Sequence, residues 1–282
     1  MTGAADVTEL LALARRAAAA GAAVLARRDP EQFEEAAKST DTDLVTTFDL
    51  AAERAVRAII LQDRPGDTIT GEELAPSVPG QDGGHHSGYR WSVDPLDGTM
   101  NFIRNISYFG TSVAVAGPDG EWLAGVVDAP ALRRVYYASR GAGAWLDEQL
   151  PGGGASVRRL TGPLLERKGR LLATSLTYRP EIQARLAAEL PARMAGFGDF
   201  RRLGSAALEL CAVAEGAIDA YLEFGLYEHD FAAGALIAQE AGAWVRRPDL
   251  SPAINGLPTP GEALSHWTAA ARPELAHSYT PG

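Results

Sequence analysis

Apolar residues recur at helical spacing at the start of the chain. Over residues 7–28 they fall three or four positions apart, which predicts an amphipathic helix capped by Asp6 or Thr8. A second helical pattern begins at Asp49 and stops at the Pro-Gly pair of residues 65–66. The first part of the chain is therefore predicted to carry two helices, joined by a polar and then β-branched stretch.

Strand-like runs fill the middle of the chain. Residues 67–73 are typical of a short strand that ends in two acids, and the segment 75–89 holds Pro, Gly and two His, so we expect a mobile loop there. Residues 90–102 predict a strand, a tight turn and the start of a helix. Further β runs follow at 108–117, 121–130 and 133–146.

The second half alternates strands with helices. Strands are predicted at 170–175 and 217–224, and helices at 181–190, within 198–216 and at 230–242. This alternation is typical of an α/β layer, whereas the first half is α+β. We expect a single unit over 1–282, with subdomains of about 1–152 and 153–282 that meet near the Gly-rich segment 150–156.

Composition narrows the class of protein. With 46% apolar and 22% charged residues, the 282-residue chain is typical of a globular protein. Its formal net charge of -10 disfavours a nucleic-acid partner. The lone Cys211 excludes an internal disulfide framework, and the most apolar early stretch, 17–26, is too short to span a bilayer. We expect a cytoplasmic protein with no membrane contact.

The most informative chemistry lies in residues 94–99. Asp94 and Asp97 stand three apart across a Pro-containing turn, so that both carboxylates and the Leu96 carbonyl can converge on one hard cation such as Mg²⁺. Gly98 and Thr99 follow at an expected helix start, where backbone N–H groups favour a phosphate. A metal-ligand pair and an anion site are thus predicted side by side.

Four other acids, Glu72, Glu73, Asp49 and Asp230, indicate a functional site only when they are taken together. Glu72 and Glu73 repel each other unless both are solvated or one binds a cation, and an exposed acidic loop is the plain alternative. Asp49 and Asp230 each precede a helical pattern, and each alone is explained as a helix N-cap.

Read together, these segments resemble the inositol monophosphatase family. The resemblance lies in "DTDLVTTFD", "GEE", "VDPLDGTMNF" and "EHDFAAGALIAQEAG", and it extends from about residue 7 to about residue 245. It implies a layered αβαβα sandwich of the inositol monophosphatase and fructose-1,6-bisphosphatase type. It also implies a Mg²⁺-dependent, lithium-sensitive phosphomonoesterase, often a homodimer, that acts on a small phosphorylated metabolite through metal-activated water.

The resemblance also implies a set of metal ligands. Glu72, Asp94 and the Leu96 carbonyl would hold the first Mg²⁺, and Asp94, Asp97 and Asp230 the second. A third, weaker ion would sit near Glu72, so that two or three ions are expected for each site. Cations held by these carboxylates would make the local potential positive, which explains how a chain of net charge -10 can bind an anionic substrate.

Catalytic and phosphate-binding roles carry over in the same way. Asp49 and Thr99 would form the pair that orients and deprotonates the attacking water, with Glu72 as a third catalytic group. The amides of Gly98 and Thr99 would hold the phosphate. Contacts to the sugar alcohol are implied for Gly204, Ser205, Ala206 and Glu223.

Three positions depart from the family or need separate mention. His229 stands where the family commonly has Trp, beside the implied metal ligand Asp230, and Met100 occupies a variable position. Lys38 matches a family Lys near the mobile metal.

Alternative functions are weighed against this one. A haloacid-dehalogenase-type phosphatase needs two Asp separated by one residue, whereas Asp94 and Asp97 are separated by two. A non-enzymatic scaffold would lack some of the ligands, and none of the acids is missing. Within the family, inositol monophosphate is the expected substrate and histidinol phosphate the runner-up. A fructose bisphosphate or a nucleotide bisphosphate is also possible, because a few pocket contacts decide among these leaving groups.

Overall fold

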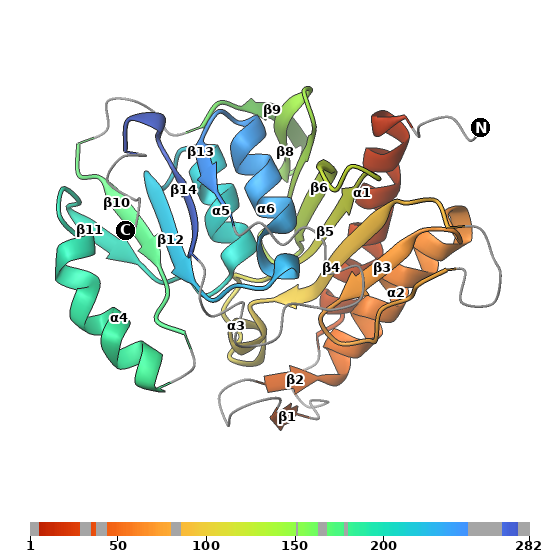
Figure 1. Ribbon diagram of the computed structural model, residues 1–282, viewed down its shortest axis with the longest axis horizontal. Helices are drawn as coiled ribbons and strands as arrows, with labels where there is room; N and C mark the ends of the chain where they lie inside the picture. Colours follow the sequence, from red (N-terminus) through yellow and green to blue (C-terminus); the bar gives the residue numbers. More distant parts are fainter. Residues whose placement is uncertain are drawn as a thin grey trace.

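The computed structural model describes most of the chain (Figure 1). The described residues are 6–28, 35–37, 44–79, 86–150, 152–162, 168–177, 180–247 and 267–275. Lys38, His85 and part of the segment 75–89 lie outside these ranges, so the expectations placed on them stay predictions. No helix in the described ranges is long and apolar enough to cross a membrane.

A seven-stranded sheet forms the first half of the fold. Its strands follow the chain order from β3 to β9, and every neighbouring pair is antiparallel except β3 and β4, which are parallel. The sheet comprises β3 (Thr68–Gly71), β4 (Arg90–Asp97), β5 (Gly110–Ala116), β6 (Trp122–Ala129), β7 (Arg134–Ser139), β8 (Gly143–Gln149) and β9 (Ala155–Leu160). The predicted strands in this region are therefore all present.

The second sheet has five strands in the order β11-β10-β12-β14-β13. Strand β10 pairs in parallel with β11 and β12, while β14 pairs antiparallel with β12 and β13. Its members are β10 (Leu171–Thr174), β11 (Asp199–Arg201), β12 (Ala220–Phe224), β13 (Trp244–Arg246) and β14 (Trp267–Ala271). A separate antiparallel pair joins β1 (Glu35–Ala37) to β2 (Leu44–Thr46).

Helices and sheets alternate in five layers (Figure 1). Helices α1 (Val7–Leu25) and α2 (Thr47–Asp63) cover the outer face of the larger sheet. Helices α5 (Ala206–Glu215) and α6 (Glu228–Glu240) lie between the two sheets, and α4 (Pro180–Arg193) lies beyond the smaller one. The short α3 (Thr99–Ile103) follows β4. The predicted αβαβα sandwich is thus confirmed.

The Gly-rich segment 150–156 does not lie between the two sheets, where a boundary between subdomains was expected. Gly152, Gly153 and Gly154, all with positive φ, connect β8 with β9 of the same sheet. The chain passes from the larger to the smaller sheet only after Leu160. The proposed division into subdomains near residue 152 stays a prediction.

Small residues let α6 pack closely on both sides. Most of its side chains are buried, as expected for a helix held between two sheets. A Cβ added at Gly125 of β6 would lie 3.0 Å from the Cα of Ala233, and one added at Gly234 would lie 2.8 Å from the Cβ of Leu210 on α5. These contacts fix the height of α6 above the sheet, and thereby the position of its N-terminal end.

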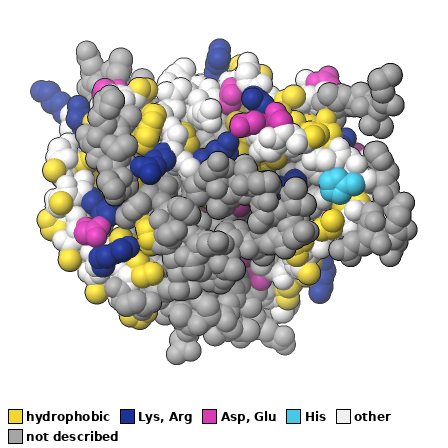
Figure 2. All heavy atoms as spheres, viewed as in Figure 1, with side chains coloured by type: hydrophobic (Ala, Val, Ile, Leu, Met, Phe, Trp, Pro, Cys, Tyr) yellow, Lys and Arg dark blue, Asp and Glu magenta, His cyan; other side chains and the backbone are white. Residues whose placement is uncertain are grey.

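Charged side chains are visible at several places on one face of the molecule (Figure 2). Among the described residues on the face drawn in Figure 2, Lys and Arg side chains are scattered and form no continuous patch.

Replacing Gly125 by Ala should destabilise the fold by about 1–3 kcal/mol, because the new methyl meets the backbone of Ala233, which cannot rotate away. Urea unfolding checks this. Gly198→Ala is the matched control, since its added Cβ meets nothing closer than 3.4 Å. Equal stability of both variants would contradict the close packing described here.

Candidate active site

The C-terminal end of β4 carries an irregularity that redirects its side chains. Asp94 pairs with Ser112 and Asp97 pairs with Gly110, so β4 has one residue more than β5 between these pairs. Pro95 lies in this bulge and its carbonyl accepts a hydrogen bond from the Thr111 hydroxyl at 2.9 Å. Bulges commonly re-aim side chains near functional sites. Here the bulge brings Asp94 and Asp97 to the inner end of the sheet.

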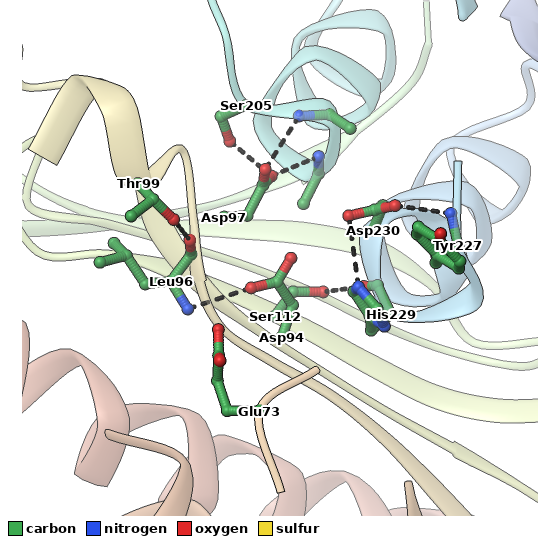
Figure 3. Close-up of polar contacts among 12 residues, drawn as sticks. Glu73, Asp94, Leu96, Asp97, Thr99, Ser112, Ser205, Tyr227, His229 and Asp230 are labelled. Atoms are coloured by element: carbon green, nitrogen blue, oxygen red, sulfur yellow. Dashed lines mark hydrogen bonds and ion pairs between the residues drawn. The ribbon is translucent and has the colours of Figure 1, made fainter. Parts of the chain in front are cut away.

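Thr99 lies at the start of α3, next to both β4 and α2. Its hydroxyl lies 3.0 Å from the Leu96 carbonyl and 3.3 Å from Oδ1 of Asp49 (Figure 3 draws the former contact). The preceding Gly98 has φ of 95°, and an added Cβ would lie 2.9 Å from the Tyr108 carbonyl. Only glycine fits this turn without strain.

Asp49 is fully buried and is not the N-cap of α2. The N-cap is Thr46, and Asp49 stands three residues inside the helix. Its Oδ2 accepts from the Thr46 amide at 2.8 Å and from the Thr46 hydroxyl at 2.6 Å. This capping box anchors one carboxylate oxygen, while Oδ1 faces Thr99. The structure therefore pairs Asp49 with Thr99, as the sequence indicated.

Asp230 has the equivalent position in α6. The helix begins at Glu228 with Tyr227 as its N-cap, and Oδ2 of Asp230 accepts from the Tyr227 amide at 2.6 Å. The plain alternative that Asp230 is only a helix N-cap does not hold, because Tyr227 occupies that position, as Thr46 does in α2. In both helices the acid three residues after the cap turns one oxygen back to the backbone and the other to the site.

Asp97 reaches from β4 to the N-terminal end of α5. Its carboxylate accepts from the Ser205 hydroxyl at 2.6 Å and from the amides of Ala206 and Ala207 at 3.2 Å and 2.7 Å (Figure 3). Burial raises its pKa to about 7; the Ser205 hydrogen bond opposes the rise, and the charge on Asp230 adds to it. Asp97 and Asp230 are thus close enough for their charges to repel.

Glu72 and Glu73 follow β3 and face the end of β4. Ligand atoms of Glu72, Asp94 and His229 lie within 4.8 Å of one another. In Figure 3 the Glu73 side chain points toward Leu96 and Asp94. The sequence placed Glu72 and Asp94 in one site, and the structure brings them together; the participation of His229 in the group was not expected.

Two buried residues hold this acidic loop, and the sequence reading missed them. Glu53 of α2 accepts through Oε2 from the amides of Glu73 at 2.8 Å and Leu74 at 3.3 Å. Arg57, one turn later, binds Glu53 and donates to the carbonyls of Leu74 and Ala75 at 2.9 Å and 3.0 Å. Gly71 leaves the space for this carboxylate, because an added Cβ would lie 2.1 Å from Glu53 Oε1. The Glu-x-x-x-Arg spacing within the α2 pattern was the available signal.

The residues implied for substrate contact lie at two places, the turn that leads into α5 and strand β12. Ser205 and Ala206 are 1% and 7% exposed and lie against Asp97, while Gly204 has φ of 85° in the turn before α5. Glu223 on β12 accepts from the Tyr221 hydroxyl at 2.6 Å, and burial raises its pKa. Their roles toward a substrate stay predictions.

Glu209 is a further buried acid that the sequence reading passed over. It accepts from the Leu203 amide at 2.6 Å, and burial together with the Glu223 charge raises its pKa well above the usual range. Its position inside the apolar pattern of α5 gave no sign of a polar role. The interior beside Asp230 thus contains three buried carboxyl groups, those of Asp97, Glu209 and Glu223, and burial raises the pKa of each.

The comparisons with known proteins agree with this geometry. The sequence profile of the inositol monophosphatase family matches residues 6–278, and the chain belongs to that family. An inositol-1-monophosphatase of Mycobacterium leprae is 40% identical over 220 residues, which cover 78% of this chain and 74% of the relative. A protein named Nus factor SuhB from Haemophilus influenzae is 37% identical over 240 residues, 84% of each chain.

A solved structure shows the same architecture over nearly the whole chain. The extragenic suppressor protein suhB from Bartonella henselae superposes with a TM-score of 0.80 at 27% identity and covers 96% of both chains. Together with the family match, the inositol-1-monophosphatase relatives establish the class of enzyme: the chain is a phosphomonoesterase.

The Glu53–Arg57 pair offers a test of how the acidic loop is held. Glu53→Gln should lower the free energy of unfolding by about 3 kcal/mol, because Arg57 keeps a buried charge without its partner. It should also speed amide hydrogen exchange at Glu73 and Leu74, which lose a carboxylate acceptor. Exchange measured by mass spectrometry over residues 70–76 checks the second effect.

Glu240→Gln is the matched control, because Glu240 likewise accepts from two backbone amides, those of Gly141 and Gly143, each at 2.9 Å. It should raise exchange at that hairpin and leave residues 70–76 unchanged. Unchanged exchange at Glu73 and Leu74 in Glu53→Gln would show that this pair does not hold the loop.

Proposed function

We propose that this phosphomonoesterase hydrolyses inositol monophosphate to inositol and phosphate with the help of Mg²⁺. The observation that carries the proposal is the Thr99 hydroxyl, which contacts both the buried Asp49 carboxylate and the Leu96 carbonyl and follows Asp94 by five residues. A hydroxyl held by a buried carboxylate, beside several further acids, is suited to orient water against a phosphate ester.

The donor set fits Mg²⁺. Glu72, Asp94, Asp97 and Asp230 supply carboxylate oxygens, and Leu96 supplies a carbonyl, the ligand types that this hard cation prefers. The raised pKa of Asp97 supports the fit, because a buried carboxylate near other negative charge is stabilised by a cation. We assign Glu72, Asp94 and Leu96 to one ion, Asp94, Asp97 and Asp230 to a second, and a weaker third to Glu72.

Bound Mg²⁺ supplies Lewis-acid chemistry, neutralising the phosphate charge and lowering the pKa of a nearby water. The chain itself supplies the proton path. Thr99 Oγ1 accepts a proton from the attacking water while its own hydrogen passes to Asp49 Oδ1 at 3.3 Å. Asp49 can take this role because its Oδ2 is fixed by Thr46, which keeps Oδ1 directed at Thr99. Glu72, whose carboxylate lies near that of Asp94, is assigned as the third member of the catalytic group.

Substrate orientation is assigned to the turns around this pair. The amides of Gly98 and Thr99 hold the phosphate, and Gly204, Ser205, Ala206 and Glu223 contact the alcohol.

Two relatives about 40% identical to this chain are named inositol-1-monophosphatase. Their names support inositol monophosphate as the substrate over histidinol phosphate and over the bisphosphates of fructose or a nucleotide. The name Nus factor belongs to the Haemophilus relative and is not carried over to this chain. Lithium inhibition, a homodimer and a cytoplasmic location stay predictions.

Replacing Asp94 by Asn should lower the rate of phosphate release by about 100-fold or more at saturating Mg²⁺, since this carboxylate is shared by two of the proposed ions. The assay compares inositol, histidinol, fructose and nucleotide phosphates, with and without Li⁺. Asp119→Asn, at an exposed acid in the β5–β6 turn, is the control and should keep full activity. Near-normal turnover in Asp94→Asn would refute the assignment.

A further inference from the structure

His229 is a buried imidazole directed at two of the acids. It stands second in α6, only 8% of its surface is exposed, and its ligand nitrogen lies within 4.8 Å of carboxylate oxygens of both Glu72 and Asp94. Figure 3 shows it beside Asp94 and Asp230 at the N-terminal end of α6. A nitrogen donor thus joins a set that would otherwise offer oxygen alone.

The ring is held in this orientation from outside the acidic group. Tyr227 stacks on it with ring centroids 5.6 Å apart and an interplanar angle of 12°. Nε2 lies 3.7 Å from Oδ1 of Asp230, which is beyond hydrogen-bond distance. At this separation Asp230 does not occupy the nitrogen as a hydrogen-bond acceptor would, so the nitrogen can bind a metal ion.

The spacing of the three donors suits a single ion. Ligand atoms about 2.1 Å from one tetrahedral ion lie about 3.4 Å apart, so a group whose ligand atoms lie within 4.8 Å of one another can reach a common ion through small side-chain rotations. Two carboxylates with one imidazole form a mixed oxygen and nitrogen set, which favours first-row transition metals over Mg²⁺.

We propose that Glu72, Asp94 and His229 form a site for a first-row transition-metal dication, such as Mn²⁺ or Co²⁺, with direct coordination by the imidazole. The proposal concerns the cation of the same pocket and rests on the proposed function only in sharing Glu72 and Asp94 with it. The ion bound by Glu72, Asp94 and His229 would then be selected as a transition metal over Mg²⁺. A site made of oxygen ligands alone selects less strongly between them.

Spectroscopy on the untagged, metal-free wild-type chain loaded with one equivalent of Mn²⁺ tests the coordination directly. Electron spin-echo measurements should show ¹⁴N coupling from one imidazole. His86→Gln, at an exposed His elsewhere, should leave the coupling unchanged, and His229→Phe, which keeps an aromatic ring against Tyr227, should abolish it. Absence of ¹⁴N coupling in the wild type would overturn the proposal whether or not any variant folds.

Calorimetry supplies the second readout. His229→Phe should weaken Co²⁺ binding about 10-fold or more and leave Mg²⁺ binding nearly unchanged, because the lost donor is the nitrogen. Equal Co²⁺ affinity in both proteins would contradict the proposal. Phosphate release by the wild type with Mg²⁺ is measured separately. Activity without ¹⁴N coupling would reject this inference alone, and coupling without activity would reject the hydrolase proposal alone.

Discussion

The confinement of several carboxylates in one poorly solvated pocket is the constraint on which this site depends. Burial disfavours the charged form of a carboxyl group and like charges at short range repel, so the pKa of Asp97 is raised first by its burial and further by the charges of Asp230 and Glu223. The fold limits the repulsion by anchoring one oxygen of an acid to a backbone amide: Asp49 to Thr46, Asp230 to Tyr227, and Asp97 to the first turn of α5. The remaining negative charge calls for cations.

The layered arrangement of the fold brings together the elements that carry these acids. Helix α2 from the outer layer, β4 from the larger sheet, and α5 and α6 from the central layer each contribute one end to the pocket (Figures 1 and 3). The height of α6 is fixed by contacts of Gly125 and Gly234, so the close packing of this helix sets the position of Asp230. Stability and function are therefore coupled through close backbone contacts rather than through the acids themselves.

Much of this arrangement could be predicted from the sequence. The apolar periodicities located the helices and strands, and the resemblance carried by residues 94–99 and 230–242 predicted the layers and the pairing of Asp49 with Thr99. The caps were misplaced by three residues, because an acid near a helix start can serve as the cap or can fold back from the third position. Glu53, Arg57 and the direction of His229 depend on tertiary contacts, which no local pattern reveals.

The convergence of these acids on a common cation is tested most directly by a crystal structure of the chain soaked in Mn²⁺, with anomalous data collected at the manganese edge. The account predicts an anomalous peak about 2.2 Å from carboxylate oxygens of Asp94 and Glu72, with Asp230 turned toward the same pocket. A pocket without such a peak at millimolar Mn²⁺, or an Asp230 carboxylate turned away from Asp94, would contradict it.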